Sequence, residues 1–262
     1  MALLGDRSVA VLEGTRGSLV LFDDRGRYLR TLGGPGGVGG FELRRPQGLD
    51  VDPEGNLWVA DTGNHRLLVV KPDGTLVATY GSLGSSGDRL REPRDVTFDR
   101  AGRAYVADTG NERIQVLRVS TGRVVASWSR RTGGRRGHLT QPVALAYSGR
   151  DAGGLWVLNR DAGRRLEFFD LEGNWETGLD VPETVVGDVT LADVVVEPTL
   201  YRMFLADRAG GRVLVLDRKG VLKGVVEAED GGLQPRGVAV GRSLDLYVAD
   251  GVGCRVVQFS PR

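Results

Sequence analysis

The sequence predicts an all-β protein built from one repeated unit, and three observations lead to this prediction. The stretch Leu57 to Leu68 (LWVADTGNHRLL) returns at Arg103 to Val116 (RAYVADTGNERIQV). Weaker copies follow at intervals of 43 to 51 residues, each ending its apolar run on a polar residue. These residues are Glu13, Asp61, Asp108, Asn159, Asp207 and Asp250. No window shows a sustained period of 3.6 residues, so helix is expected to be scarce.

Each unit reads as four short strands, as residues 46–81 illustrate. Apolar alternation starts at Gly48 and stops before the Pro53-Glu54-Gly55 break. Further strands are expected at 57–61, 67–70 and 76–80, between clusters of Gly, Pro, Asn and Asp. Four antiparallel strands per unit, repeated six times at a period in the forties, predict a six-bladed β-propeller. A solenoid is the poorer alternative, because long β-solenoid repeats usually stack parallel strands.

The six units are expected to form a single propeller domain over residues 1–262, because an all-β domain of this size need not be divided. The expected blades cover approximately 1–33, 45–81, 92–129, 141–179, 191–227 and 234–262. The last unit offers only three strands before Arg262, so the last blade is expected to lack its outer strand. Either the chain is cut from a longer protein or this blade has three strands. An uncovered strand edge is a template for pairing, so we expect it to be short or covered by a partner chain.

The pattern shared by the second and third units resembles the NHL repeat. It reads P-x-G-L-x-V-D-x-x-G-x-L-W-V-A-D-T-G-N-x-R. The resemblance is strong in these two units, fair in the fifth and sixth, and weak in the first and fourth. It implies a six-bladed propeller like those of bacterial NHL-repeat proteins and of tripartite-motif proteins. In the latter, such a domain selects substrates or RNA for an attached ubiquitin ligase, although no RING or coiled-coil part is present here. One fold hosts many functions, so the resemblance implies no single one.

Composition indicates a soluble, cytoplasmic protein. The chain has no apolar run near eighteen residues and no charged, apolar leader, so neither a membrane partner nor export is expected. Cys254 is the only cysteine, which excludes a disulfide framework. The net charge of +1 excludes a strongly basic domain but leaves room for a local basic face.

The sequence offers no catalytic residue, metal ligand set or cofactor motif. Its two histidines, His65 and His138, cannot build a zinc site with one cysteine, and His65 is expected to be solvated in its turn. A calcium site made of carboxylates and carbonyls stays open, because it needs no motif. No nucleophile elbow, Walker loop or dinucleotide fingerprint occurs. A lyase- or hydrolase-type propeller with a channel site is therefore only an alternative.

The acidic residue that ends each copy is interpreted as architecture, because a group repeated around six blades usually is. An aspartate at a strand end can accept backbone N–H groups of the following turn. It can also pair with the arginine that follows in most units. These arginines are Arg66, Arg113, Arg165, Arg212 and Arg255, with Ser18 at this position in the first unit.

Binding is expected at the irregular loops that join one blade to the next, because loops on a rigid scaffold carry most binding residues. The third junction reads SRRTGGRRGH, and arginines also flank other junctions. The candidate binding residues for an anionic partner are Arg94, Arg130, Arg131, Arg135, Arg136 and Arg236. A solvated, Arg-rich loop without function explains the pattern as well. Few aromatic residues (Phe41, Tyr80 and Trp128) lie nearby for base stacking. The sequence thus favours a non-catalytic scaffold that binds a protein partner, with single-stranded RNA as the alternative.

Overall fold

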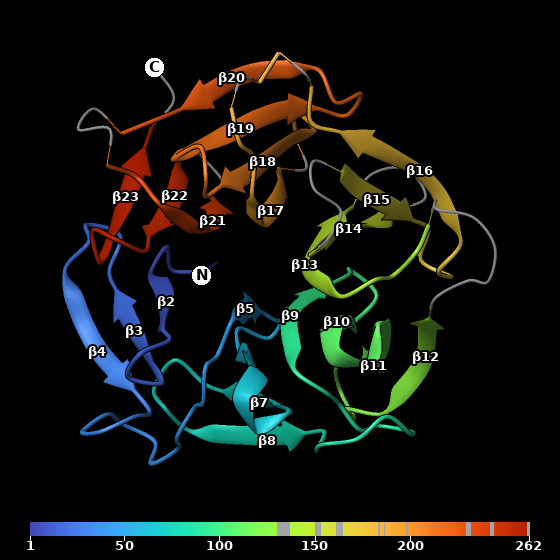
Figure 1. Ribbon diagram of the computed structural model, residues 1–262. Helices are drawn as coiled ribbons and strands as arrows, with labels where there is room; N and C mark the ends of the chain where they lie inside the picture. Colours follow the sequence, from blue (N-terminus) through green and yellow to red (C-terminus); the bar gives the residue numbers. More distant parts are fainter. Residues whose placement is uncertain are drawn as a thin grey trace. The chain divides into compact units, whose positions relative to one another are not determined.

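The computed structural model describes residues 1–129, 137–149, 153–160, 165–182, 184–185, 187–197, 199–228, 232–241 and 244–260. The chain is a six-bladed β-propeller, nearly all β, as predicted (Figure 1). Over the described residues the only helices are two three-residue 3₁₀ turns, η1 (Thr62–Asn64) and η2 (Thr109–Asn111). Neither of these described turns is long and apolar enough to cross a membrane. The chain divides into two compact units, Met1–Arg130 with Leu139–Pro142, and Arg131–His138 with Val143–Arg262. The single domain stays a prediction.

The first unit contains three four-stranded antiparallel sheets, each a blade whose strands follow chain order. The first sheet comprises β1 (Ala2–Leu3), β2 (Val9–Glu13), β3 (Ser18–Phe22) and β4 (Tyr28–Leu32). The second comprises β5 (Gly48–Val51), β6 (Leu57–Asp61), β7 (Arg66–Val70) and β8 (Leu76–Tyr80). The third comprises β9 (Pro93–Phe98), β10 (Arg103–Asp108), β11 (Arg113–Arg118) and β12 (Val124–Ser129). The strands expected in the second blade are thus confirmed within one residue.

The second unit continues the series with two four-stranded sheets and one of three strands. The fourth sheet comprises β13 (Pro142–Ser148), β14 (Gly154–Asn159), β15 (Arg165–Phe169) and β16 (Trp175–Asp180). The fifth comprises β17 (Leu191–Glu197), β18 (Arg202–Asp207), β19 (Arg212–Asp217) and β20 (Leu222–Val226). The last comprises β21 (Pro235–Val240), β22 (Leu246–Asp250) and β23 (Arg255–Phe259). The predicted absence of a fourth strand from the last blade is confirmed.

The core lies between neighbouring sheets, which explains why the second strand of a blade is apolar without interruption. All five residues of β6 are buried. Leu57 and Val59 pack into a cluster with β2 and β3 of the preceding blade. Trp58 and Ala60, on the other face, pack into a cluster with β9 and β10 of the next blade. Because side chains alternate along a strand, a strand covered on both faces has apolar residues at every position.

In both units, the first strands of two successive blades lie against one another, and an aspartate side chain links them. In the first unit, Thr97 on β9 donates its hydroxyl to Asp50 Oδ2 on β5 at 3.1 Å. In the second unit, the N–H of Val238 on β21 donates to Asp193 Oδ2 on β17 at 2.9 Å. Burial raises the pKa of Asp193, and the N–H donors of Val238 and Val194 oppose this rise.

The contact of β5 with β9 predicts that Gly48→Ala destabilises the protein by about 1–3 kcal/mol. The new Cβ would stand 2.5 Å from both the Arg94 carbonyl oxygen and the Asp95 Cα, which are backbone atoms. Gly224→Ala on β20 is the matched control, because no heavy atom lies within 4 Å of its Cβ position. Its effect should stay within about 0.5 kcal/mol. Chemical denaturation measures both variants, and equal losses would contradict the close packing at Gly48.

Candidate functional site

Within a blade, the turn after the second strand and the junction loop that precedes the first strand lie at the same end. This follows from strand direction, because successive antiparallel strands reverse. In the second blade these segments are η1 and residues 33–47, and hydrogen bonds join them directly. The candidate site is built from these two segments.

The central contact of the second blade is made by Asp61, which ends β6 and is 0% exposed. Its Oδ1 accepts the backbone N–H of Arg44, in the preceding junction loop, at 2.7 Å. Its Oδ2 accepts from the Asn64 amide and from the Arg66 guanidinium, each at 2.8 Å. The Arg44 carbonyl in turn accepts the N–H of Gly63 at 2.7 Å. Turn and loop therefore hold each other, and we call this arrangement the aspartate clasp.

Three further blades repeat the aspartate clasp. In each, the aspartate accepts a backbone N–H from the junction loop and the Nε–H of the arginine five residues later, at 2.6 to 3.1 Å. The sets are Asp108 with Arg91 and Arg113, Asp207 with Thr190 and Arg212, and Asp250 with Gln234 and Arg255. The sequence-based interpretation of these aspartates as architecture is confirmed. What the sequence did not reveal is the junction-loop donor, 16 or 17 residues upstream.

The first and fourth blades depart from this pattern. Asn159, in the fourth blade, donates its amide to the His138 carbonyl at 3.0 Å. The expected pairing of Arg165 with this position was wrong, because a neutral amide attracts the guanidinium less than the nearby carboxylates of Glu167 and Asp180 do. Arg165 binds these two at 2.9 and 2.7 Å. In the first blade, Glu13 accepts the Ser18 hydroxyl at 3.3 Å.

A second set of contacts ties the two 3₁₀ turns to residues further along the first unit. The Thr62 hydroxyl donates to the Pro93 carbonyl at 2.7 Å, and Thr109 does the same to Pro142 at 2.5 Å. His65 accepts the backbone N–H of Glu92 on its Nδ1 at 3.0 Å. The expectation that His65 is solvated was therefore wrong. Its ring is half-buried and holds the next junction loop, an interaction that local sequence does not reveal.

The clasps fix the junction backbone while the junction side chains stay exposed. The backbone of Arg44 is bonded at both N–H and C=O, yet its side chain is exposed and lies over Gly63; Arg91 and Gly110 repeat this. We call the exposed side chains of residues 38–45 and 82–91 the junction surface. Its charged members are Glu42, Arg44, Arg45, Asp88, Arg89 and Arg91, and its large apolar members are Val38 and Leu83. The junction surface is thus of mixed charge with apolar residues between the charges.

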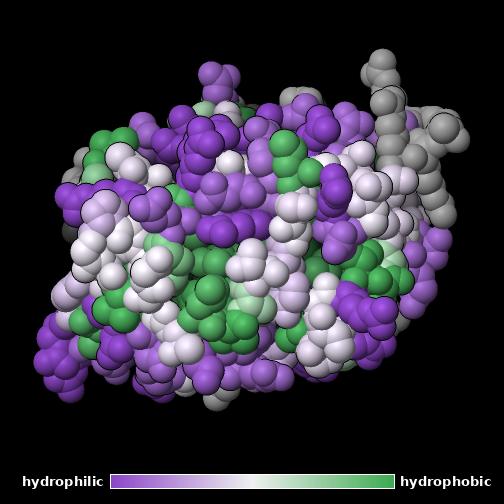
Figure 2. All heavy atoms as spheres, turned by 90° about the horizontal axis from the view of Figure 1, so that it is seen from below, coloured by the Kyte–Doolittle hydropathy of each residue, from purple (hydrophilic) through white to green (hydrophobic). Residues whose placement is uncertain are grey.

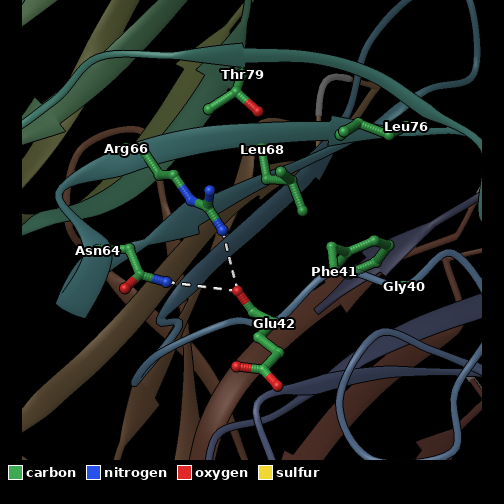
Figure 3. Close-up of a pocket in the computed structure, with 8 residues that line it drawn as sticks. All are labelled: Gly40, Phe41, Glu42, Asn64, Arg66, Leu68, Leu76 and Thr79. Atoms are coloured by element: carbon green, nitrogen blue, oxygen red, sulfur yellow. Dashed lines mark hydrogen bonds between the residues drawn. The ribbon is translucent and has the colours of Figure 1, made fainter.

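A groove of about 590 Å³ adjoins the junction surface on the second blade. Figure 3 shows Arg66 and Asn64 at one end, where both donate to the Glu42 carbonyl, with Leu68, Leu76 and Thr79 along the strands. Figure 2 views the side on which β8 lies in Figure 1, and apolar atoms are exposed in the middle of this side. Leu76 is 50% exposed whereas Leu68 is buried, so the exposed lining of the groove is mainly polar.

The structure describes two of the six arginines that were predicted as binding residues. Arg130, Arg131, Arg135 and Arg136 lie outside the described residues. Arg94 is half-buried on β9, and Arg236 is exposed on β21 with its side chain over Gly251. These two belong to different units. Their joint role as a binding surface stays a prediction.

The aromatic residues considered for base stacking serve the core. Phe41 and Trp128 are buried. Tyr80 stacks on Trp58, with ring centroids 5.3 Å apart, and burial raises the pKa of its phenol. In the first unit, no exposed aromatic ring accompanies the arginines of the described junction surface.

No group of three or more His, Cys, Asp or Glu side chains in the described part of the chain could hold a metal ion. The repeated aspartates accept hydrogen bonds from N–H groups, and the partial positive charge of these groups would repel a cation. Cys254 is exposed.

The repeated module coincides with a known sequence family. The family model described as NHL repeat matches residues 43–70 and 90–117. Each match starts in a junction loop, passes through the aspartate clasp and ends in the third strand of a blade. The chain is a β-propeller that contains NHL repeats at these two positions. A comparison with curated protein sequences gives no match.

Solved structures share the fold of this NHL-repeat propeller at low sequence identity. Hydrazine synthase from Kuenenia stuttgartiensis aligns with a TM-score of 0.73 and 14% identity, over 99% of this chain and 94% of the other. A catalytically inactive virginiamycin B lyase from Staphylococcus aureus, crystallised with quinupristin, aligns with a TM-score of 0.67 and 11% identity, over 99% and 80%. A streptogramin B lyase aligns with a TM-score of 0.64 and 14% identity, over 97% and 76%. At such identities the likeness concerns the fold alone.

The aspartate clasp predicts that Asp61→Asn lowers the free energy of unfolding by ~3 kcal/mol, because it leaves a partly buried guanidinium without its counter-charge. Asp180→Asn is the control. Asp180 also pairs with an arginine, but its side chain is 68% exposed, so its loss should cost less than ~1 kcal/mol. Denaturant titration distinguishes the two. Similar small effects would show that Asp61 is dispensable.

The clasp of the last blade also predicts a pH dependence. Burial by itself raises the pKa of Asp250, but N–H donors from Gln234, Gly253 and Val252 and the Arg255 guanidinium outweigh it, so the pKa lies below its ordinary 3.8. A lowered folded-state pKa stabilises the protein above pH 3.8, and this contribution is lost as the pH falls through the lowered value. The Tm difference between wild type and Asp250→Asn should therefore be constant near neutral pH and shrink in acid. A difference that does not change with pH would contradict this.

Proposed function

We propose that this propeller is a non-catalytic recognition scaffold that binds a protein partner through its junction surface and the adjoining groove. The observation that carries the proposal is the combination of a fixed junction backbone with exposed junction side chains. Such a surface is preorganised, so binding does not require loop ordering and its entropy cost is small. Rigid scaffolds that present variable loops are used for recognition in many folds.

The chemistry of the junction surface supports a protein partner. Its four arginines share the two segments with Glu42 and Asp88, and Val38 and Leu83 are about half exposed. Protein interfaces combine apolar contacts with arginine in this way. A single-stranded RNA site needs a continuous positive face and stacking rings. The described junction surface has neither, because acidic residues interrupt it and the nearby aromatic rings are in the core.

The proposal concerns binding rather than catalysis for a chemical reason. The repeated carboxylates of four blades are committed to backbone N–H groups and arginines, so they are poorly placed to act as acid or base. Two lyases with the same fold share 11% and 14% sequence identity with this chain. Identity at this level indicates a shared fold and not a shared reaction.

The test replaces Arg44, Arg45, Arg89 and Arg91 together with alanine. Peptides selected by display against the wild-type protein should bind the quadruple variant at least tenfold more weakly, because four exposed guanidinium groups of the surface are gone. The Tm should stay almost unchanged, because Arg44 and Arg91 take part in the clasps through their backbone, which alanine retains. Fluorescence anisotropy measures binding and calorimetry measures Tm.

The control is the double variant Arg25→Ala and Arg100→Ala. Both residues are exposed but lie in turns at the opposite end of their blades, so peptide binding should be retained. Selected peptides that bind the quadruple variant as tightly as wild type would overturn the proposal. Tight binding of a random single-stranded RNA pool, with a steep salt dependence lost in the quadruple variant, would assign the surface to RNA instead.

A further inference from the structure

The last blade exposes a strand that is buried in every other blade. β23 occupies the third-strand position, and none of its residues is buried. The residues equivalent to Val256 in the other blades are all 0% exposed, whereas Val256 is half-buried. These equivalents are Leu19, Leu67, Ile114, Leu166 and Val213. Among the described residues, no fourth strand lies beside β23 (red in Figure 1).

The five complete blades share one register between third and outer strand. In each, the pairing is regular for at least three residues and then shifts by one, at the same place. The shifts follow Leu21, Val69, Val116, Phe168 and Val215. A β-bulge repeated at one position is a designed feature of the pairing. In β23 the equivalent position lies between Gln258 and Phe259.

The five outer strands also share a side-chain pattern of five residues. The first and fifth positions are apolar in all of them, and the second is the bulged residue. The first positions are Tyr28, Leu76, Val124, Trp175 and Leu222, and the fifth are Leu32, Tyr80, Trp128, Leu179 and Val226. The fourth position is Thr, Ser or Gly in four strands. The fifth residue pairs with the equivalent of Val256 and the first with the equivalent of Phe259.

We propose that the edge of β23 is a docking site for an extended segment of a partner protein with the pattern apolar–any–any–small–apolar. The segment would run antiparallel to β23, with its fifth residue opposite Val256 and its first opposite Phe259. Main-chain hydrogen bonds would supply affinity, and the two apolar positions would supply specificity, as in other cases of strand addition. The partner's first side chain would lie on the face of Val257 and Phe259, which border a core cluster, and its fifth would lie on the opposite face beside Val256.

A second copy of this chain fits the edge poorly as an occupant. Paired β23 strands would present Arg255-Val256-Val257-Gln258-Phe259 to each other, with a charged residue at the first position instead of an apolar one. Shifting by one residue places Ser260 at the fifth position. Neither register has the pattern of the five resident outer strands. The docking site is independent of the junction surface, since it uses a strand edge rather than loops.

The experiment uses a fluorescent peptide of residues 73–82, which contains the resident pattern Leu76-Val77-Ala78-Thr79-Tyr80. The intact protein should bind it, and a peptide with Leu76 and Tyr80 replaced by serine should bind at least tenfold more weakly. Hydrogen exchange with bound peptide should slow at Val256 to Phe259. Val256→Asp should weaken binding at least tenfold by placing a charge opposite the fifth residue. Val225→Asp, on the exposed outer strand β20, is the matched control and should bind as wild type.

Several results would overturn this proposal. One is no binding of the peptide, or equal binding of both peptides. Another is slowed exchange elsewhere in the chain without slowing in β23, a readout that does not depend on the folding of any variant. A third is a dimer in sedimentation that Val256→Asp dissociates, which would assign the edge to a second copy. The quadruple arginine variant should bind the peptide normally, so failure of one proposal is distinguishable from failure of the other.

Discussion

The structure of four of the six blades depends on a carboxylate that is buried at the end of the second strand. A junction loop has no neighbouring strand to accept its N–H groups, and an unpaired N–H in a buried position is costly. The aspartate supplies the acceptor, and the arginine five residues later supplies the positive charge that a buried carboxylate requires. The two residue types therefore recur together. Where the fourth blade has Asn159 instead, the arginine turns to other carboxylates.

This constraint gives the backbone and the side chain of one junction residue different surroundings. At Arg44 and Arg91 the backbone serves the clasp, while the side chain is exposed. A sequence can change such side chains without disturbing the hydrogen bonds that hold the loop. The shared fold of hydrazine synthase and the streptogramin lyases agrees with this, because one propeller frame carries different functions.

Local sequence was sufficient to predict the repeating parts of the fold. The period, the turn residues and the alternation placed the strands, and the short last unit indicated its three-stranded sheet. Contacts between residues far apart in the sequence were not predicted. Nothing near Arg44 marks its N–H as the donor to Asp61, and nothing near His65 marks its contact with Glu92, 27 residues away. The sequence also could not show which arginines lie in the same unit. Arg94 and Arg236 share a position in the repeat but lie in separate units.

Buried aspartates lock the junction backbone in four blades, and amide hydrogen exchange can measure this effect. The N–H groups of Arg44, Arg91, Thr190 and Gln234 lie outside regular strands, yet each donates to a carboxylate. We expect these four amides to exchange as slowly as amides within the strands. Asp61→Asn should accelerate exchange at Arg44 far more than at Arg91. Rapid exchange at all four in the wild-type protein would contradict it.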